Sequence, residues 1–338
     1  MTSHHAARRV RYRVTAIVWV VSVEFFAMNV MSSFWTALTR RLRLLAAWLC
    51  LGAVAALSAC GAGTTFEPLT TPSRLIVFGD GMADLGQIGG TRYTINDGTA
   101  NIWVEQVASS YSQTMTVSAI GGFGYAQGNA LVDTAGSAPS IAQQFTAFLT
   151  STALTNKDIV LIDGGTTELS LLAQQYVAGT IASSTALNAS ATAAGTALAA
   201  QVRRVVVSGG KQVAVMDAYD MGKSPYAINN TVTAVIQGAT RAYNDALKIA
   251  IVDLGSNVLL LDREAYINLV VASPASYLGT GAIANTAVCI VTANLCNNST
   301  LVSGANPLLY LFADQFYFTP AAQRLIGNYA YSKIRNRW

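Results

Sequence analysis

Histidine is almost missing from this sequence: among 338 residues there are only two, His4 and His5. A serine hydroxyl near neutral pH is a poor nucleophile unless a base next to it takes its proton, and histidine is the commonest such base. Beyond position 5 the chain has no imidazole. The sequence therefore excludes a serine–histidine pair from any domain further along.

Charged residues are also scarce, at 11%, against 52% hydrophobic residues. There are only seven prolines and no long run of charge, which argues against disorder and favours one globular domain. Without residues 1–60, 14 of 21 basic and 16 of 17 acidic side chains remain, a net charge of −2. No phosphate-binding surface is expected, so nucleic acid is excluded as a partner.

The segment 31–60 has the order of a bacterial secretion signal. A basic patch precedes an apolar run from Leu44 to Leu57, and small residues follow up to Cys60. The ending LSAC resembles a lipobox, the site at which processing cuts before the cysteine and acylates it. The apolar run is shorter than the ~20 residues that span a bilayer. We expect a signal over 1–59 and a lipidated Cys60 with a tether to residue 73; the alternative is a transmembrane anchor with an unmodified cysteine.

The first 30 residues are also apolar but carry Glu24 near their middle. Met31 begins a tidier signal than Met1, so we interpret 1–30 as a translation start placed too early; a second membrane segment is the alternative.

Lipid chains on Cys60 would anchor the protein to a membrane. Gly61 is compatible with the outer membrane of a Gram-negative cell. We therefore expect an exported protein at the cell envelope, in the outer membrane or periplasm.

Only four cysteines occur, and two of them lie in or at the end of the signal. The other two, Cys289 and Cys296, close a short loop. In an oxidising compartment a disulfide is the natural interpretation. A metal site at this pair would need further ligands, and no suitable cluster lies nearby in the sequence. We expect neither a metal nor a cofactor.

From residue 74 to 338, apolar runs of strand length alternate with helix-like stretches. This alternation predicts an α/β fold: a three-layer α/β/α sandwich with a mainly parallel sheet. Acid-bearing turns follow the expected strands, which indicates a site at their carboxyl ends. The strands are expected at 74–79, 158–163, 212–218 and 257–262, and the helices at 100–111, 140–151, 183–207, 233–254 and 319–335.

Four short blocks occur in the order found in the GDSL or SGNH ester hydrolases, and the chain resembles that family from about Arg74 to Ile334. The stretch SPASYLGTG at 273–281, the cysteine pair and YLFAD at 310–314 are similar to the segment before the last block in secreted members. The blocks are FGDGMADLG at 78–86, GYAQGNA at 124–130, GTTE at 165–168 and DQFYFTP at 314–320.

The resemblance implies a flavodoxin-like fold and a particular chemistry. In that family a first-block serine attacks an ester carbonyl, and a last-block histidine, oriented by an aspartate, takes its proton. A first-block amide, a second-block glycine and a third-block asparagine hold the oxyanion, each donor contributing ~3 kcal/mol or more. In this sequence the serine position is Gly81, the histidine position Tyr317, the asparagine position Thr167 followed by Glu168, and the aspartate and glycine are Asp314 and Gly128.

Because glycine has no side chain and a phenol with an unperturbed pKa of about 10 is a weak base, the triad is disabled. Asp80 and Asp84 are expected to bond the turn amides and cap the following segment. Gly128 and Thr167 are candidates to bind a carbonyl or a sugar hydroxyl. A serine–lysine pair at Lys223 and Ser224 is formally open, although the two are adjacent only in sequence.

Three functions are compatible with these residues. The first is a catalytically inactive envelope lipoprotein that binds an acyl or glycan ligand. The second is an ester hydrolase with a non-standard site, using water activated by Asp314 or Glu168. The third is a structural protein of the envelope, held at the membrane for contacts with other proteins.

Overall fold

In the computed structural model, residues 71–99 and 102–338 are described, and they belong to one compact unit, Pro68–Trp338. The expected signal at 1–59, the lipidated Cys60 and most of the tether lie outside the described residues. Among the described helices, none is long and apolar enough to cross a membrane.

Four parallel strands form the central sheet in the order β1-β2-β3-β4: Arg74–Gly79, Asp158–Asp163, Gln212–Met216 and Val258–Leu261. All six residues of β2 are buried, as expected for a strand covered on both faces. An irregular segment at 123–127 runs beside β1, because the Tyr125 amide donates to the Val77 carbonyl and the Gln127 amide to the Gly79 carbonyl. Counting this segment, the order is 2-1-3-4-5, that of flavodoxin-like sheets.

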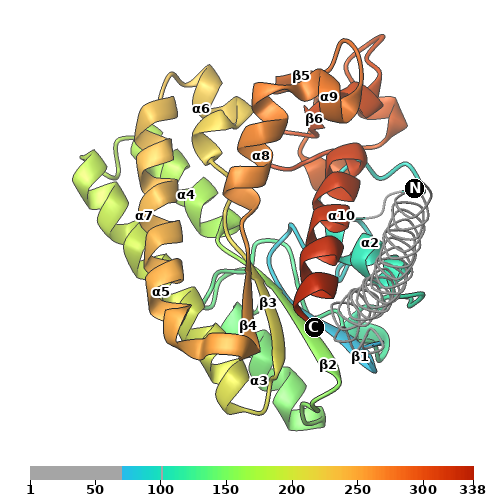
Figure 1. Cartoon of the computed structure of the whole chain (residues 1–338). Coiled ribbons are helices and arrows are strands. Elements are labelled where there is room, and N and C mark those ends of the chain that lie inside the picture. The colour runs from blue at the N-terminus through green and yellow to red at the C-terminus, as the bar shows by residue number, and fades with distance from the viewer. Residues whose placement is uncertain (1–70, 100–101) are drawn as a thin grey trace, which may run out of the picture. The chain divides into compact units, whose positions relative to one another are not determined.

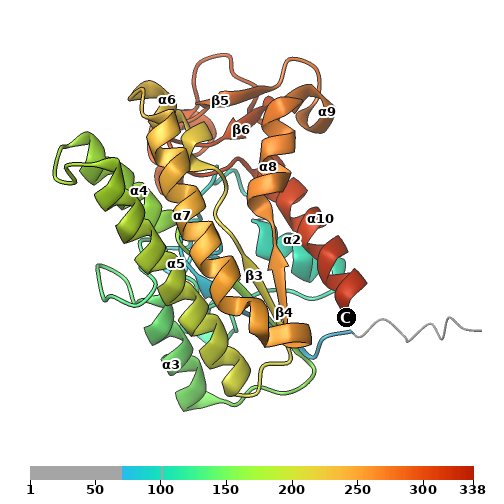
Figure 2. The same cartoon turned by 60° about the vertical axis from the view of Figure 1, so that its left-hand side comes forward.

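Helices cover both faces of the sheet, so the predicted three-layer fold is confirmed (Figure 1). Helices α2 and α10 pack together on one face, while α5 and α7 pack together on the other (Figure 2). The principal helices are α2 Trp103–Ser110, α3 Ile141–Ser151, α4 Thr166–Val177, α5 Ser184–Val207, α7 Thr233–Ile251, α8 Arg263–Ala272 and α10 Pro320–Arg337.

The alanine-rich segment is a single helix, α5, and its small residues have a packing role. A Cβ on Gly195 would lie 2.2 Å from the Tyr243 carbonyl oxygen of α7, so only glycine permits this approach. Helix α10 begins as predicted, with Thr319 as N-cap and Pro320 at the first position. Four helices were not predicted: α4, α8 and the short α6 Pro225–Asn229 and α9 Pro274–Leu278.

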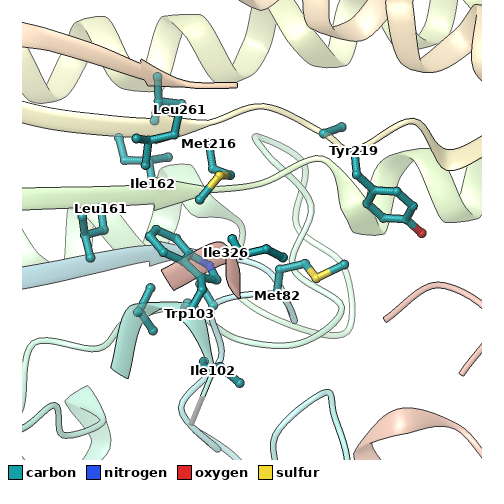
Figure 3. Packing of buried hydrophobic residues seen from close by; sticks show 14 of the residues in the cluster. Met82, Ile102, Trp103, Leu161, Ile162, Met216, Tyr219, Leu261 and Ile326 are labelled. Carbon is teal, nitrogen blue, oxygen red and sulfur yellow. The ribbon is translucent and has the colours of Figure 1, made fainter. Parts of the chain in front are cut away.

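A second, two-stranded sheet lies near the carboxyl ends of the main strands (Figure 1). It pairs β5 Ile283–Ala287 with β6 Tyr310–Phe312. Below it, the hydrophobic core runs between the sheet and α10, with Trp103, Met82 and Ile326 fully buried (Figure 3). This packing fixes the turn after β1, which carries the candidate site residues.

Candidate functional site

The turn that follows β1 is held by two buried aspartates. The Asp80 carboxylate accepts hydrogen bonds from the amides of Met82 and Thr167, and Asp84 accepts from Gly86 and Gln87. Both aspartates are at most 3% exposed. Their contacts are those of turn-forming residues, as the sequence predicts, and Asp80 also ties the turn to the start of α4.

Gly81, at the position of the family's serine, lies under two tyrosine rings. A Cβ on Gly81 would lie 2.8 Å from the Tyr317 phenol oxygen and 2.8 Å from Cγ of Tyr93. The two rings contact each other, with centroids 4.9 Å apart. Both Cβ distances are shorter than a real Cβ tolerates. The space that a serine side chain would need is therefore filled.

Gly128 does not offer a free amide to a ligand, which corrects one expectation from the sequence. Its amide donates to the Asp84 carboxylate at 2.7 Å. Its Cα is covered by Tyr93, because a Cβ there would lie 1.9 Å from Cε2 of that ring. The amide that the resemblance assigns to an oxyanion is used within the protein.

Thr167 keeps a free hydroxyl at the site. Its amide donates to the Asp80 carboxylate at 3.0 Å. Its hydroxyl is buried close to the Tyr317 phenol, but it reaches hydrogen-bond geometry with no described residue. A buried hydroxyl without a partner is costly, so a ligand oxygen or a water is a natural partner for it.

Asp314 is 8% exposed and its carboxylate is fully engaged. It accepts hydrogen bonds from the backbone amides of Ala293, Phe316 and Tyr317 at 2.7 to 2.9 Å. Burial raises the pKa of Asp314, and these three hydrogen bonds partly offset the increase. In place of orienting a side-chain base, the aspartate fixes the loop that carries Tyr317.

The Tyr317 phenol cannot serve as a base. Burial, and then the negative charge of Asp80, raise the pKa of Tyr317 well above its usual value. The phenol therefore stays protonated at any physiological pH and can only donate or accept a hydrogen bond. Its position over Gly81 makes it part of the floor of the site.

Glu168 lies beside Asp80 and shares its electrostatic environment. One carboxyl oxygen accepts from the Val132 amide, while the other is buried with no partner among the described residues. Burial, and secondarily the charge of Asp80, raises the pKa of Glu168 to about 8. Burial and the neighbouring Asp163 raise the pKa of Asp80 to about 7. At pH 7 Glu168 is therefore mainly neutral.

Below this floor, the acids at the strand ends are partly paired. The carboxylate of Asp163, at the end of β2, accepts hydrogen bonds from both terminal nitrogens of Arg263, at 2.9 and 3.0 Å. Both residues are fully buried. The Arg263 amide donates to Asp217 at the end of β3. The sequence predicted the clustering of acids but not their arginine partner.

The disulfide between Cys289 and Cys296 is formed, as predicted. It closes the loop that makes one wall of the site, and this loop is tied to residues far away in the sequence. The Asn96 amide donates to the Cys296 carbonyl at 2.7 Å, and the Cys289 amide donates to the Ala313 carbonyl. The wall is therefore fixed to both the 87–99 loop and the residue that follows β6.

A pocket of about 610 Å³ lies at the carboxyl ends of the strands, and Thr167, Cys289 and Tyr317 are among its lining residues. Asp314 is the one charged side chain among its lining residues. Tyr226 and Phe316 form an aromatic pair in it, with ring centroids 4.8 Å apart. Four rings line it, from Tyr93, Tyr226, Phe316 and Tyr317, and four amide side chains, from Asn129, Gln174, Asn294 and Gln315.

The serine–lysine pair is not a catalytic dyad. The Ser224 hydroxyl donates to the Met221 carbonyl at 2.6 Å and accepts from the Ala227 amide, so it caps α6. Ser224 is 1% exposed and does not line the pocket. Sequence reasoning missed Tyr93, Tyr226 and Phe316. Tyr93 and Tyr226 lie outside the family blocks, and Phe316 occupies an unspecified position of the last block.

Comparison with known proteins finds similarity among solved structures. No family model and no curated protein matches the sequence. Among solved structures, the chain matches a member of the lipolytic protein G-D-S-L family from Veillonella parvula DSM 2008 at 12% identity and a TM-score of 0.43. The match covers 76% of this chain and 95% of that chain. The roles of individual residues rest on the geometry given above.

Proposed function

We propose that this protein is an envelope lipoprotein, acylated at Cys60, whose hydrolase-like domain binds a neutral glycan and does not hydrolyse it. One observation carries the catalytic part of the proposal. Tyr317 and Tyr93 occupy the space above Gly81, so position 81 has neither a nucleophilic side chain nor the room for one. Fold alone does not confer activity when the reacting groups are missing.

The lining of the pocket supports a glycan as the ligand class. Among the lining residues only Asp314 is charged, and its carboxylate already accepts three backbone hydrogen bonds. Amide side chains both donate and accept, which suits the hydroxyls of a sugar. The ring faces of Tyr226 and Phe316 suit the apolar face of a sugar ring. An acyl substituent on the glycan could contact Ile290 and Val291 on the wall.

Hydrolysis by water that a carboxylate activates is the competing function. A general base must be deprotonated and must reach the water. Glu168 does not line the pocket, and burial raises its pKa to about 8. Asp314 is held by the Ala293, Phe316 and Tyr317 amides. Neither group is therefore suited to that role.

The binding test uses calorimetric titration of the purified protein with neutral envelope oligosaccharides and their acetylated forms. Replacing Tyr226→Ala is expected to weaken binding at least about tenfold, which corresponds to ~1.4 kcal/mol. Tyr277→Ala, a change of the same size on a half-buried ring outside the pocket, serves as the matched control. Equal loss in both variants, or no binding by the unaltered protein, would contradict the proposal.

The hydrolysis test uses short and medium p-nitrophenyl esters and a serine-directed fluorophosphonate. We expect no turnover and no labelling. Turnover that Asp314→Ala abolishes would instead support the hydrolase. Attachment through Cys60 is tested separately, because a Cys60→Ala variant that still fractionates with membranes would contradict acylation as the anchor.

A further inference from the structure

The end of the domain opposite the pocket has an unusual surface. All four strands of the main sheet are parallel and begin at this end, and α5, α7 and α10 finish there (Figure 2). We call it the strand-start face. It is made of residues of the helix ends and of the loops that precede the strands: Lys157, Val207, Lys211, Ile249, Val252, Arg335, Arg337 and Trp338.

Three large apolar side chains of this face project into solvent. Val207 at the end of α5 is 81% exposed, Val252 just after α7 is 78% exposed and Ile249 is 74% exposed. Val207 and Val252 are the most exposed large apolar residues of the described chain. Arg203 on α5 donates to the Ala250 carbonyl and the Asp253 carboxylate. This link holds the two helix ends side by side, so the three residues share one surface.

The same face is basic. Lys157 precedes β2, Lys211 precedes β3, and Arg335 and Arg337 end α10; all four are exposed. The Arg337 side chain donates to the Gly255 carbonyl, just before β4. Asp253, an exposed acid two residues before Gly255, is paired with Arg203 at 2.6 Å. Asp158, at the start of β2, is paired with Arg74.

The chain enters the domain at this face. Thr71, the first described residue, lines a cavity of about 250 Å³ together with Tyr111, Tyr331, Arg335 and Trp338. The Trp338 indole donates to the Ser256 carbonyl, which joins this cavity to the segment that carries Val252. Tryptophan and tyrosine beside basic side chains are typical of membrane interfaces.

We propose that the strand-start face rests on an anionic phospholipid surface and thereby turns the pocket away from the bilayer. The proposal rests on attachment of the chain at Cys60. Cys60 lies eleven residues before Thr71, and a chain of that length extends roughly 40 Å at most. Exposed apolar side chains would enter the headgroup region, while the basic ones would contact lipid phosphates.

The test compares hydrogen exchange of the full chain in phosphatidylglycerol-containing vesicles, in phosphatidylcholine vesicles and in detergent micelles. Exchange in segments 203–211, 249–257 and 331–338 is expected to slow about tenfold or more in the anionic vesicles alone. Exchange in 287–302, at the pocket end, is expected to be unchanged. The proposal is overturned by equal exchange in all three media, by protection of both ends, or by a chain that floats with neither vesicle.

Two sets of variants give the test its controls. Lys211→Glu with Arg335→Glu is expected to abolish the protection while the chain still floats with the vesicles. Leu295→Ser with Leu308→Ser changes apolar residues that are 63% and 56% exposed at the pocket end, and it should leave the protection intact. Protection that persists in micelles and rises with protein concentration would mark self-association and refute the proposal. Glycan titration of the same samples reports the pocket independently.

Discussion

The phenol oxygen of Tyr317 lies 2.8 Å from the point that a Cβ on Gly81 would occupy. The absence of a side chain at position 81 and the closure of the space above it are therefore one structural feature, because the Tyr317 ring fills that space. Tyr93 completes the closure, and it comes from a loop outside the family motifs. A serine introduced at position 81 would therefore need these two rings to move.

The first prediction concerns Gly81→Ser. Because the added side chain would overlap Tyr317 and Tyr93, this variant is expected to unfold more easily by about 1 to 3 kcal/mol, with no esterase activity. Adding Tyr317→His removes the phenol oxygen and should recover part of the lost stability. Denaturant unfolding and p-nitrophenyl acetate turnover measure the two effects.

Gly136→Ser provides the control for that experiment. A Cβ on Gly136 would meet only Leu131, at 3.8 Å, so this serine should change the free energy of unfolding by about 0.5 kcal/mol or less. If Gly81→Ser proved as stable as Gly136→Ser, the tyrosine pair would have to be mobile, and the closed floor described above would be wrong.

The second prediction concerns the disulfide. Replacing both Cys289 and Cys296 by alanine is expected to lower the free energy of unfolding by about 2 kcal/mol, since the bridge closes a short loop. Because this loop is a wall of the pocket, affinity for a bound glycan should fall as well. Reduction of the unaltered protein with dithiothreitol should reproduce both effects. A loss of stability without a loss of affinity would show that the wall does not contact the ligand.

The third prediction follows from the raised pKa values of buried acids. The pKa of Glu168 is raised from 4.5 to about 8, and that of Asp80 from 3.8 to about 7. At a pH between its unfolded and its folded pKa, each of these carboxyls keeps its proton in the folded state and has released it in the unfolded state. Stability is therefore lost as pH rises from about 4 to 8. Denaturant unfolding at a series of pH values should show the protein more stable at pH 5 than at pH 8.

A Glu168→Gln variant tests the origin of that slope. The amide is neutral at every pH, so the decline in stability between pH 5 and 8 should become shallower, and the variant should gain stability relative to the unaltered protein at pH 8. Asp245→Asn, a change at an exposed carboxyl on α7, is the control and should leave the slope unchanged. An identical slope in both variants would mean that Glu168 is solvated in the folded state.

The sequence predicts best those helices and strands whose contacts are local in the chain. Strands 74–79 and 158–163 were predicted to the residue, because strands buried on both faces read as continuous apolar runs between polar turns. Thr319 and Pro320 marked the start of α10 because capping is decided within one turn. Helix α4 was missed since its first turn, GTTE, was interpreted only as a family block.

The site was predicted less completely, because its decisive contacts join distant residues. Gly81, Thr167, Asp314 and Tyr317 do meet at the strand ends, as their motif positions implied. No local pattern marks Tyr93, although its ring covers Gly128 and contacts Tyr317. The hydrogen bond from the Gly128 amide to Asp84 is equally long-range. A sequence without the catalytic residues of the family that it resembles therefore says little about which side chains occupy their positions.

The last prediction concerns the buried ion pair below the pocket. Arg263→Met is expected to lower the free energy of unfolding by about 3 to 5 kcal/mol, because it leaves the fully buried Asp163 without a counter-charge. Adding Asp163→Asn removes that charge and should restore much of the loss, which separates a charge effect from a packing effect. Arg203→Ala breaks an exposed pair with Asp253 and should change the free energy of unfolding far less than Arg263→Met does. Denaturant unfolding is measured for the three variants. A double variant no more stable than Arg263→Met would assign the loss to the packing of the arginine side chain and to the hydrogen bond that its Nε donates to the Asp217 carbonyl.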